Sequence, residues 1–308
     1  MKKLSSKKAG KTIIGIDAGA TSSESVLYST DKKENKTKYF HFPPINYNLL
    51  GVKKTVDTLC DIIDKTRCGN SLAKIGFIAA GIAGARHDLD RIRIKNLLTE
   101  RLDYNNIAIF PDTEIAHASV FEPDETNCGI LISGTGSVLY YKDNERKTIR
   151  IGGWGRYLGD EGSGYWIAKE ALADATKHYD GRGRQTLLAS EIHKRFDITA
   201  DTILQKVYHD DFEISKITGT VFDCAENGDI ISADIIMKAA EHLADHFIPL
   251  KNLRSTIALC GSLFSEEKLL EQYLTEIVKE KYPQIELFNP KQRPVIGAVN
   301  IAKRILKL

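Results

Sequence analysis

The chain has few cysteines, and their placement excludes most cysteine chemistry. Five cysteines occur in 308 residues, an odd number, and no two of them form a C-x-x-C pair. A disulfide framework or a structural zinc site needs paired or closely spaced cysteines. The pattern therefore predicts a reduced intracellular protein, and we expect it in the cytoplasm. Cys128 and Cys260 lie in apolar strand-like runs and are expected to be small core residues.

The sequence also lacks a strong charge of either sign and any long apolar run. A net charge of +2 gives no reason to expect nucleic acid or an anionic membrane as a partner. No apolar stretch approaches the length of a membrane span. The basic segment KKLSSKK has no apolar region after it, so we expect a frayed terminus rather than a secretory signal. Gly10-Lys11-Thr12 is not a P-loop, because Ser5 stands where the first glycine is required and a strand follows.

Two glycine-rich turns stand between pairs of strand-like runs. The first lies in TIIGIDAGATSSESVLYS and the second in CGILISGTGSVLYY. Glycine permits positive φ and carries no side chain, so successive backbone N–H groups can converge on an anion. A strand, not a helix, follows each turn, which excludes a dinucleotide fingerprint. One such turn would also fit an ordinary hairpin. Two of them indicate a duplicated fold that binds a polyphosphate.

The order of the expected elements repeats along the chain. The first part contains strands at 12–17, 24–29, 38–42, 75–80 and 107–110, with helices before and after the fourth. The three-strand opening then recurs at 128–133, 137–142 and 148–151, followed by helices, a strand at 256–259, a helix at 266–281, a strand at 285–288 and a helix from Pro294. Such a repeat predicts an α/β protein of two related lobes facing one cleft. We place the boundary near 113–118, which gives lobes 1–115 and 116–308, and the C-terminal helix 294–308 is a candidate to pack on the first lobe.

Two aspartates directly follow strands, where open α/β sheets bind their ligands. A carboxylate at Asp17, beside the first glycine turn, can hold Mg²⁺ against phosphate oxygens, directly or through water. The alternative is a hydrogen-bonded turn aspartate. Asp112 is placed to act as a base for a hydroxyl at the cleft. Taken alone, it would be interpreted first as a helix N-cap.

The segment RIGGWGRYLGDEGSGYWIAKEAL is too rich in glycine for a core helix and too aromatic for a linker. Trp154 can form an apolar wall against a sugar face, and Asp160 can accept hydrogen bonds from sugar hydroxyls. Ser163 is expected to cap the helix that follows. A purely structural loop is the alternative.

Weaker signals come from isolated glycines and histidines. Gly261 and Gly297 each allow close approach of an adenine or ribose, or equally of a packed helix. The histidines at 41, 117 and 178 show no metal-ligand spacing, and we interpret them as surface or cap residues. Acid–base chemistry is better assigned to carboxylates.

Taken together, these motifs resemble the sugar-kinase branch of the actin–hexokinase–Hsp70 ATPase superfamily. The chain is most similar to the N-acetylglucosamine kinase family, within the BadF/BadG/BcrA/BcrD ATPase group. The resemblance runs from about Thr12 to Ala302 and rests on DAGATSS, NYNLLG, ISGTGS, LCGSLF and above all GGWGRYLGDEGSGYW. It implies two ribonuclease-H-like lobes of the actin/hexokinase type, each a mixed β-sheet flanked by helices, with a cleft between them.

The resemblance also implies a role for each motif. Asp112 would be the catalytic base that accepts the proton of the sugar 6-hydroxyl, and Asp17 would order Mg²⁺ through water. The residues implied to bind ATP are Asp17, Gly19, Ala20, Thr21, Gly134, Thr135, Gly136, Ser137, Gly261, Ser262 and Gly297. Those implied to contact the sugar are Asn46, Ala83, Gly84, Asp112, Thr135, Gly153, Trp154, Gly155 and Asp160.

The implied reaction is in-line transfer from ATP to the 6-hydroxyl of an amino sugar, most closely N-acetylglucosamine. ATP and Mg²⁺ are the implied cofactors, a homodimer is expected, and neither nucleic acid nor membrane is a partner. The small residues of GIAGAR stand where some relatives place a hydroxyl near the acetyl group, which leaves a glucosamine kinase as an alternative. An ATP-dependent activator of a radical dehydratase or reductase is a second alternative, although its iron–sulfur cluster needs two suitable cysteines per chain. A sugar sensor on the same fold is a third.

Overall fold

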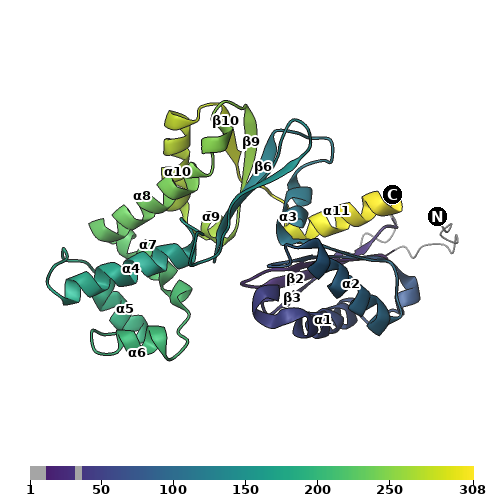
Figure 1. The fold of residues 1–308 in the computed structure, drawn as a ribbon, viewed down its shortest axis with the longest axis horizontal. Coiled ribbons are helices and arrows are strands. Elements are labelled where there is room, and N and C mark those ends of the chain that lie inside the picture. The colour runs from purple at the N-terminus through teal and green to yellow at the C-terminus, as the bar shows by residue number, and fades with distance from the viewer. Residues whose placement is uncertain (1–11, 32–36) are drawn as a thin grey trace. The chain divides into compact units, whose positions relative to one another are not determined.

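The computed structural model describes residues 12–31 and 37–308, which form two compact units (Figure 1). The first unit holds the residues up to Glu125 together with Lys291–Leu308, and the second holds Thr126–Pro290. The sequence-based prediction puts the boundary at 115/116, with 116–308 as one lobe. The basic segment 2–8 and the Gly10-Lys11 pair lie outside the described residues.

The first unit is built on a five-stranded mixed sheet of order β3-β2-β1-β4-β5. The three-strand opening is antiparallel, while β4 and β5 run parallel to β1. The strands are β1 (Thr12–Ala18), β2 (Ser23–Ser29), β3 (Thr37–Phe42), β4 (Ile75–Ile82) and β5 (Ile107–Pro111). The helices are α1 (Tyr47–Thr66), η1 (Leu72–Lys74), α2 (Asp88–Leu102), α3 (Asp112–Val120) and α11 (Pro294–Leu306).

Helices cover both faces of this sheet, and the alternation along β1 decides which side chain meets which helix. Ile14 and Ile16 point into a core shared with α1 and α2. Ile13 points the other way, into a core shared with α3 and α11. Because α11 supplies buried residues to that second core, the C-terminal segment is an integral part of the first unit.

The second unit repeats the arrangement with a sheet of order β10-β9-β6-β7-β8. Its strands are β6 (Cys128–Ser133), β7 (Ser137–Lys142), β8 (Thr148–Gly152), β9 (Ser255–Cys260) and β10 (Ile285–Phe288). Its helices are α4 (Gly164–Tyr179), α5 (Leu188–Phe196), α6 (Ile203–Tyr208), η2 (Ile214–Ile217), α7 (Thr218–Glu226), α8 (Ile230–Asp245), η3 (Ile248–Leu250), α9 (Ser262–Glu266) and α10 (Lys268–Lys281). Read from β8 to β10, this sheet has the same strand order and the same mixture of parallel and antiparallel pairs as the first. The predicted α/β fold of two related lobes is therefore confirmed.

The structure differs from the sequence-based expectation in a few local features. The helix expected at 266–281 is α10, which begins at Lys268, and a short helix that was not expected, α9, precedes it. The apolar residues whose spacing predicts this helix do not all lie on the buried side of α2: Ile94 and Leu98 are buried, whereas Ile92 and Leu97 are exposed. His117 is neither a surface nor a cap residue, because it is buried in α3 beside Phe121. Among the described helices, none has the length and apolarity to cross a membrane.

Candidate functional site

In the first unit, the predicted site residues gather where three parallel strands end. Asp17 near the end of β1 is in register with Gly81 of β4, and Ile82 of β4 is in register with Pro111 of β5. Residues that follow these strands therefore meet at one edge of the sheet. Asp112 is the first residue of α3, directly after β5.

The two aspartates at this edge influence each other. Burial, the charge of Asp112 and then the charge of Glu24 raise the pKa of Asp17 from 3.8 to about 7. A buried carboxylate with a raised pKa ionises most readily when a nearby cation offsets its negative charge. The geometry therefore fits the sequence-based hypothesis that Asp17 orders a divalent cation.

Asp112 does not occupy the N-cap position that a simple sequence interpretation assigns to it. Pro111 is the cap residue of α3, and Asp112 Oδ1 accepts a hydrogen bond from the N–H of Thr113 at 2.9 Å. Because proline has no side-chain acceptor, the helix begins without a side-chain cap. The carboxylate is partly exposed at the end of the sheet.

Backbone hydrogen bonds tie three predicted binding segments of the first unit together. The N–H of Ile45 donates to Gly19 O at 2.9 Å, which joins the first glycine turn to the segment before α1. The N–H of Ala83 donates to Ala18 O at 2.8 Å, and the N–H of Tyr47 donates to Ala83 O at 2.9 Å. Ala20 and Thr21 lie exposed at the tip of the turn. The structure thus brings the predicted phosphate turn and the predicted sugar segments to one place.

Asn46 and Gly84 meet directly in this network. Asn46 is the N-cap of α1, and its Oδ1 accepts a hydrogen bond from the N–H of Asn48 at 3.0 Å. Gly84 has a φ of 82°, and a Cβ added there would lie 2.7 Å from Asn46 Oδ1. Only glycine fits this position, for both conformational and steric reasons.

In the second unit, the turn between β6 and β7 contacts the GGWG…GDEGS segment. The N–H of Gly164 donates to Gly134 O at 2.7 Å, and Ser137 Oγ donates to Glu161 O at 2.6 Å. Ser133 Oγ donates to Gly162 O at 2.9 Å. The predicted phosphate turn, which carries Thr135 at its tip, and the predicted sugar segment therefore form one body.

Asp160 lies at the junction of these two segments. A Cβ added at Gly136 would lie 2.8 Å from Asp160 Oδ2, and the N–H of Gly155 donates to Asp160 Oδ1 at 3.2 Å. Asp160 itself has a φ of 58°, an uncommon conformation for a residue other than glycine. Backbone strain of this kind is concentrated at functional sites.

The loop from Gly153 to Gly155 is shaped by left-handed glycines and presents Trp154 to solvent. Trp154 is 71% exposed, so its ring is open to a ligand. The Arg150 guanidinium donates to Gly153 O and anchors the loop to β8. Ser163 caps α4 as predicted, accepting from the N–H of Trp166 at 3.2 Å.

The two isolated glycines have different surroundings. Gly261 precedes α9 with a φ of 101°, and a Cβ there would lie 2.2 Å from Ser133 O, while Ser262 lies next to Gly134. The 261–262 segment thus adjoins the second predicted phosphate turn. Gly297 instead packs α11 on α3, because a Cβ there would lie 1.7 Å from Ile115 O. This packing accounts for Gly297 without a nucleotide.

Sequence reasoning missed His246, which lies against Gly152 at the end of β8. The ring is only 6% exposed, and burial lowers its pKa. Its Nδ1 lies 3.1 Å from His242 O, while Nε2 has no hydrogen-bond partner among the described residues. Nε2 would lie 2.3 Å from a Cβ at Gly152, so the ring fills the space that this glycine leaves. No sequence signal reveals the pair, because the two residues lie far apart in the chain.

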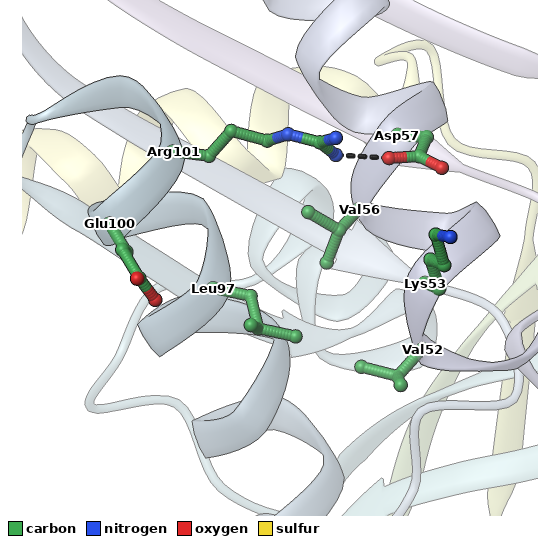
Figure 2. A pocket seen from close by; sticks show the side chains of 7 residues that line it. All are labelled: Val52, Lys53, Val56, Asp57, Leu97, Glu100 and Arg101. Atoms are coloured by element: carbon green, nitrogen blue, oxygen red, sulfur yellow. Dashed lines mark hydrogen bonds and ion pairs between the residues drawn. The ribbon is translucent and has the colours of Figure 1, made fainter.

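A surface hollow of ≈ 480 Å³ lies between α1 and α2, away from these residues. Figure 2 shows Asp57 of α1 paired with Arg101 of α2 at one side, and Val52, Val56 and Leu97 below. None of its lining residues is among those predicted to bind ATP or sugar. In the described part of the chain, no group of three or more His, Cys, Asp or Glu side chains forms a metal site.

The chain belongs to the BadF/BadG/BcrA/BcrD ATPase family, whose sequence pattern it matches over residues 14–302. It is 28% identical over 305 residues to the N-acetylmuramic acid/N-acetylglucosamine kinase of Clostridium acetobutylicum, with 95% of this chain and 98% of the relative covered. It is 26% identical over 317 residues to the N-acetyl-D-glucosamine kinase of Dictyostelium discoideum, covering 94% and 97%.

Solved structures support the fold. A Chromobacterium violaceum protein provisionally assigned as an N-acetylglucosamine kinase superposes with a TM-score of 0.76 at 17% identity, covering 96% of this chain and 99% of that one. A ROK family glucokinase from Streptomyces griseus, solved with glucose and AMPPNP, gives a TM-score of 0.61 at 14% identity, covering 95% and 99%. Family membership and the two kinase relatives place the chain among ATP-dependent sugar kinases.

Proposed function

We propose that the protein transfers the γ-phosphoryl group of ATP to the 6-hydroxyl of an amino sugar, with N-acetylglucosamine as the first candidate. Both curated relatives carry N-acetylglucosamine kinase in their names. The observation that most supports the proposal is the pair of interacting aspartates, Asp17 and Asp112, where β1 and β5 end. A kinase of this type needs one carboxylate for a cation and one for the accepting hydroxyl.

In this proposal the two aspartates have different roles, one as a base and one as a holder of the cation. Asp112 accepts the proton of the sugar hydroxyl as that oxygen attacks phosphorus. Asp17 would hold Mg²⁺ through water, and the ion would supply positive charge beside the phosphate groups. A single protein carboxylate is a common holder for this ion. With the ion bound, the ionised form of Asp17 would be favoured, although burial otherwise raises the pKa of this residue.

The remaining predicted residues bind and orient the two substrates. The tips of the two turns, Gly19–Thr21 and Thr135–Gly136, offer backbone N–H groups to phosphate oxygens. Ser137 instead holds the second turn in place by donating to Glu161 O. Asn46, Gly84 and Asp160 supply polar contacts to sugar hydroxyls, and Trp154 supplies an apolar face. The catalytic contribution is mainly positioning and electrostatic stabilisation.

A single assay tests the reaction and its sugar together. ADP release should be measured with N-acetylglucosamine, glucosamine, N-acetylmannosamine, glucose and N-acetylmuramic acid at equal concentrations. We expect the highest kcat/KM with an N-acetylated sugar. A preference for glucosamine would support the alternative amino-sugar kinase, and no response to any sugar would overturn the kinase proposal.

The activator alternative needs two accessible cysteines per chain, and among the described residues Cys68 is the only one that is exposed. Cys128 and Cys224 are buried in the second unit, and burial raises the pKa of Cys224 to about 11 and of Cys260 to about 12. Iron–sulfur ligation requires thiolates that a cluster can reach. An iron assay on anaerobically purified protein separates the two functions, since the kinase binds no iron.

A further inference from the structure

The end of α8 packs against the end of β8 through a buried histidine. His246 is the C-cap residue of α8, and its side chain is buried. A Cβ added at Gly152 would overlap the ring at Nε2 and Cδ2, so the imidazole occupies the space that a larger residue would need there. Gly152 directly precedes the loop 153–160, which carries Trp154 and Asp160. His246 is therefore placed to act on the predicted sugar contacts through Gly152.

The chain enters this loop through two consecutive left-handed glycines. Gly152 has a φ of 72° and Gly153 a φ of 68°, and together they turn the chain just before Trp154. The Arg150 guanidinium donates to Gly153 O, while the His246 ring lies against Gly152. Because glycine is conformationally permissive, the pair keeps one conformation only while such contacts hold it.

Both ends of the loop rest on α8. At the start His246 meets Gly152, and at the far end a Cβ added at Gly162 would lie 2.6 Å from Ala239 O. The far contact involves only backbone atoms of α8, so it does not change with pH. The near contact depends on a ring that can take up a proton.

The surroundings of the ring show where its proton lies. Nδ1 lies 3.1 Å from His242 O, and a carbonyl oxygen accepts only from an N–H, so Nδ1 carries the proton of the neutral ring. Nε2 has no hydrogen-bond partner among the described residues, and a second proton would have to go there, against Gly152. Burial lowers the pKa of His246, although the charges of Glu161 and Asp245 act in the opposite direction.

We propose that His246 is a positioning residue for sugar binding: its neutral ring holds Gly152 and so sets the position of the Trp154 loop, and protonation releases that loop. The inference rests on the proposed function, which assigns Trp154 to the sugar. A buried imidazolium without an acceptor is unfavourable, so the protonated ring turns towards water and leaves Gly152 unsupported. Sugar affinity falls when the loop is released, whereas ATP binding, assigned to the two glycine turns, changes less.

The kinetics of the full-length enzyme with N-acetylglucosamine test this role. His246→Ala empties the space beside Gly152, so the KM for the sugar should rise about tenfold at about pH 8 while the KM for ATP stays within about twofold. His193→Ala is the matched control, because His193 is an exposed histidine on α5 of the same unit, and it should behave as the wild type.

The pH profile separates positioning from simple packing. The pKa of His246 is lowered from 6.5, so the ring takes up its proton only below that pH. As the pH falls from about 8 to about 5.5, the sugar KM of the wild type should therefore rise. His246→Gln keeps a polar side chain but cannot take up the proton, and this rise should be absent from its profile.

A double-mutant cycle tests the contact itself. Gly152→Ala puts a Cβ into the ring of His246 and should raise the sugar KM about tenfold or more. In the His246→Ala background the same Cβ enters empty space, and its effect should be at least about threefold smaller. If Gly152→Ala alone fails to fold, recovery of the fold in the double variant gives the same answer.

The outcomes that would overturn the inference are distinct from failure of the proposed function. An enzyme that phosphorylates the sugar, but whose sugar KM is unchanged in His246→Ala, would leave the proposed function intact and remove the positioning role. Equal rises in the KM for sugar and for ATP would make His246 a structural residue. A rise at acidic pH that persists in His246→Gln, or an equal effect of Gly152→Ala in both backgrounds, would also overturn the inference. A wild type that phosphorylates no sugar would overturn both.

Discussion

At the residue scale, Asp112 carries the chemistry that we propose. Replacing it with alanine removes the base without touching the glycine turns, so turnover should fall by about 10²–10⁴-fold. ATP binding should change little, as measured by titration of a fluorescent ATP analogue. Asp124→Ala is the matched control, because Asp124 is exposed and outside the predicted site. Near-normal turnover of the Asp112→Ala enzyme would refute the assignment of the base.

A second prediction concerns Asp17 and the way the stability of the folded protein depends on pH. Its folded-state pKa of about 7 lies above the ordinary 3.8, so folding disfavours the ionised form. Without Mg²⁺, its contribution to stability should be greatest below pH 4 and decline until about pH 7. Asp17→Asn should therefore gain about 1–2 kcal/mol relative to wild type between pH 4 and 8, after allowance for the partial exposure of the side chain. Urea unfolding at several pH values measures this difference, and a pH-independent difference would contradict the shift.

At the element scale, the contact between α3 and α11 depends on Gly297. An alanine Cβ there would overlap the backbone oxygen of Ile115, which cannot move without displacing α3. Gly297→Ala should destabilise the protein by about 2–4 kcal/mol. Gly219→Ala in α7 is the matched control, since nothing lies within 4 Å of a Cβ at that position. The control should be neutral or slightly stabilising, because alanine favours helix.

Thermal unfolding of both glycine variants measures the effect. Equal melting temperatures for Gly297→Ala and wild type would mean that the helices separate at little cost. In that case Gly297 would be free for the nucleotide role that the sequence suggested.

The apolar patterns of the helices show what the sequence alone predicts about an element, namely its position, and what it does not, namely which residues are buried. Apolar spacing correctly located α1 and α2, because an amphipathic helix repeats its buried side. The spacing did not tell which residues of α2 are buried, because Ile92 and Leu97 follow it and yet face solvent. Spacing indicates that a helix has an apolar side, but only the packed neighbours decide which residues are covered.

At the scale of the whole molecule, the C-terminal helix α11 belongs to the first unit. Four residues of α11, Val295, Ala298, Val299 and Ala302, are fully buried in the core behind β1. A chain ending at residue 290 should therefore lose hydrogen-exchange protection in β1 and β4 while β6 and β9 keep theirs. A chain ending at residue 306 is the control, since it lacks only the two residues after α11. Equal protection of all four strands in the shorter chain would contradict this division.

The sequence by itself determined the repeat, the glycine turns and the position of each chemistry-bearing motif. These are local properties: strand alternation, glycine conformations and carboxylates after strands are set by residues close together in the chain. Tertiary structure alone decided which distant groups meet. In the folded chain the charge of Asp112 acts on Asp17, and Gly136 lies against Asp160. Likewise, His246 lies against Gly152, and α11 packs in the core of the first unit. Such pairings depend on how sheets and helices pack, and a single sequence records their members without recording that they touch.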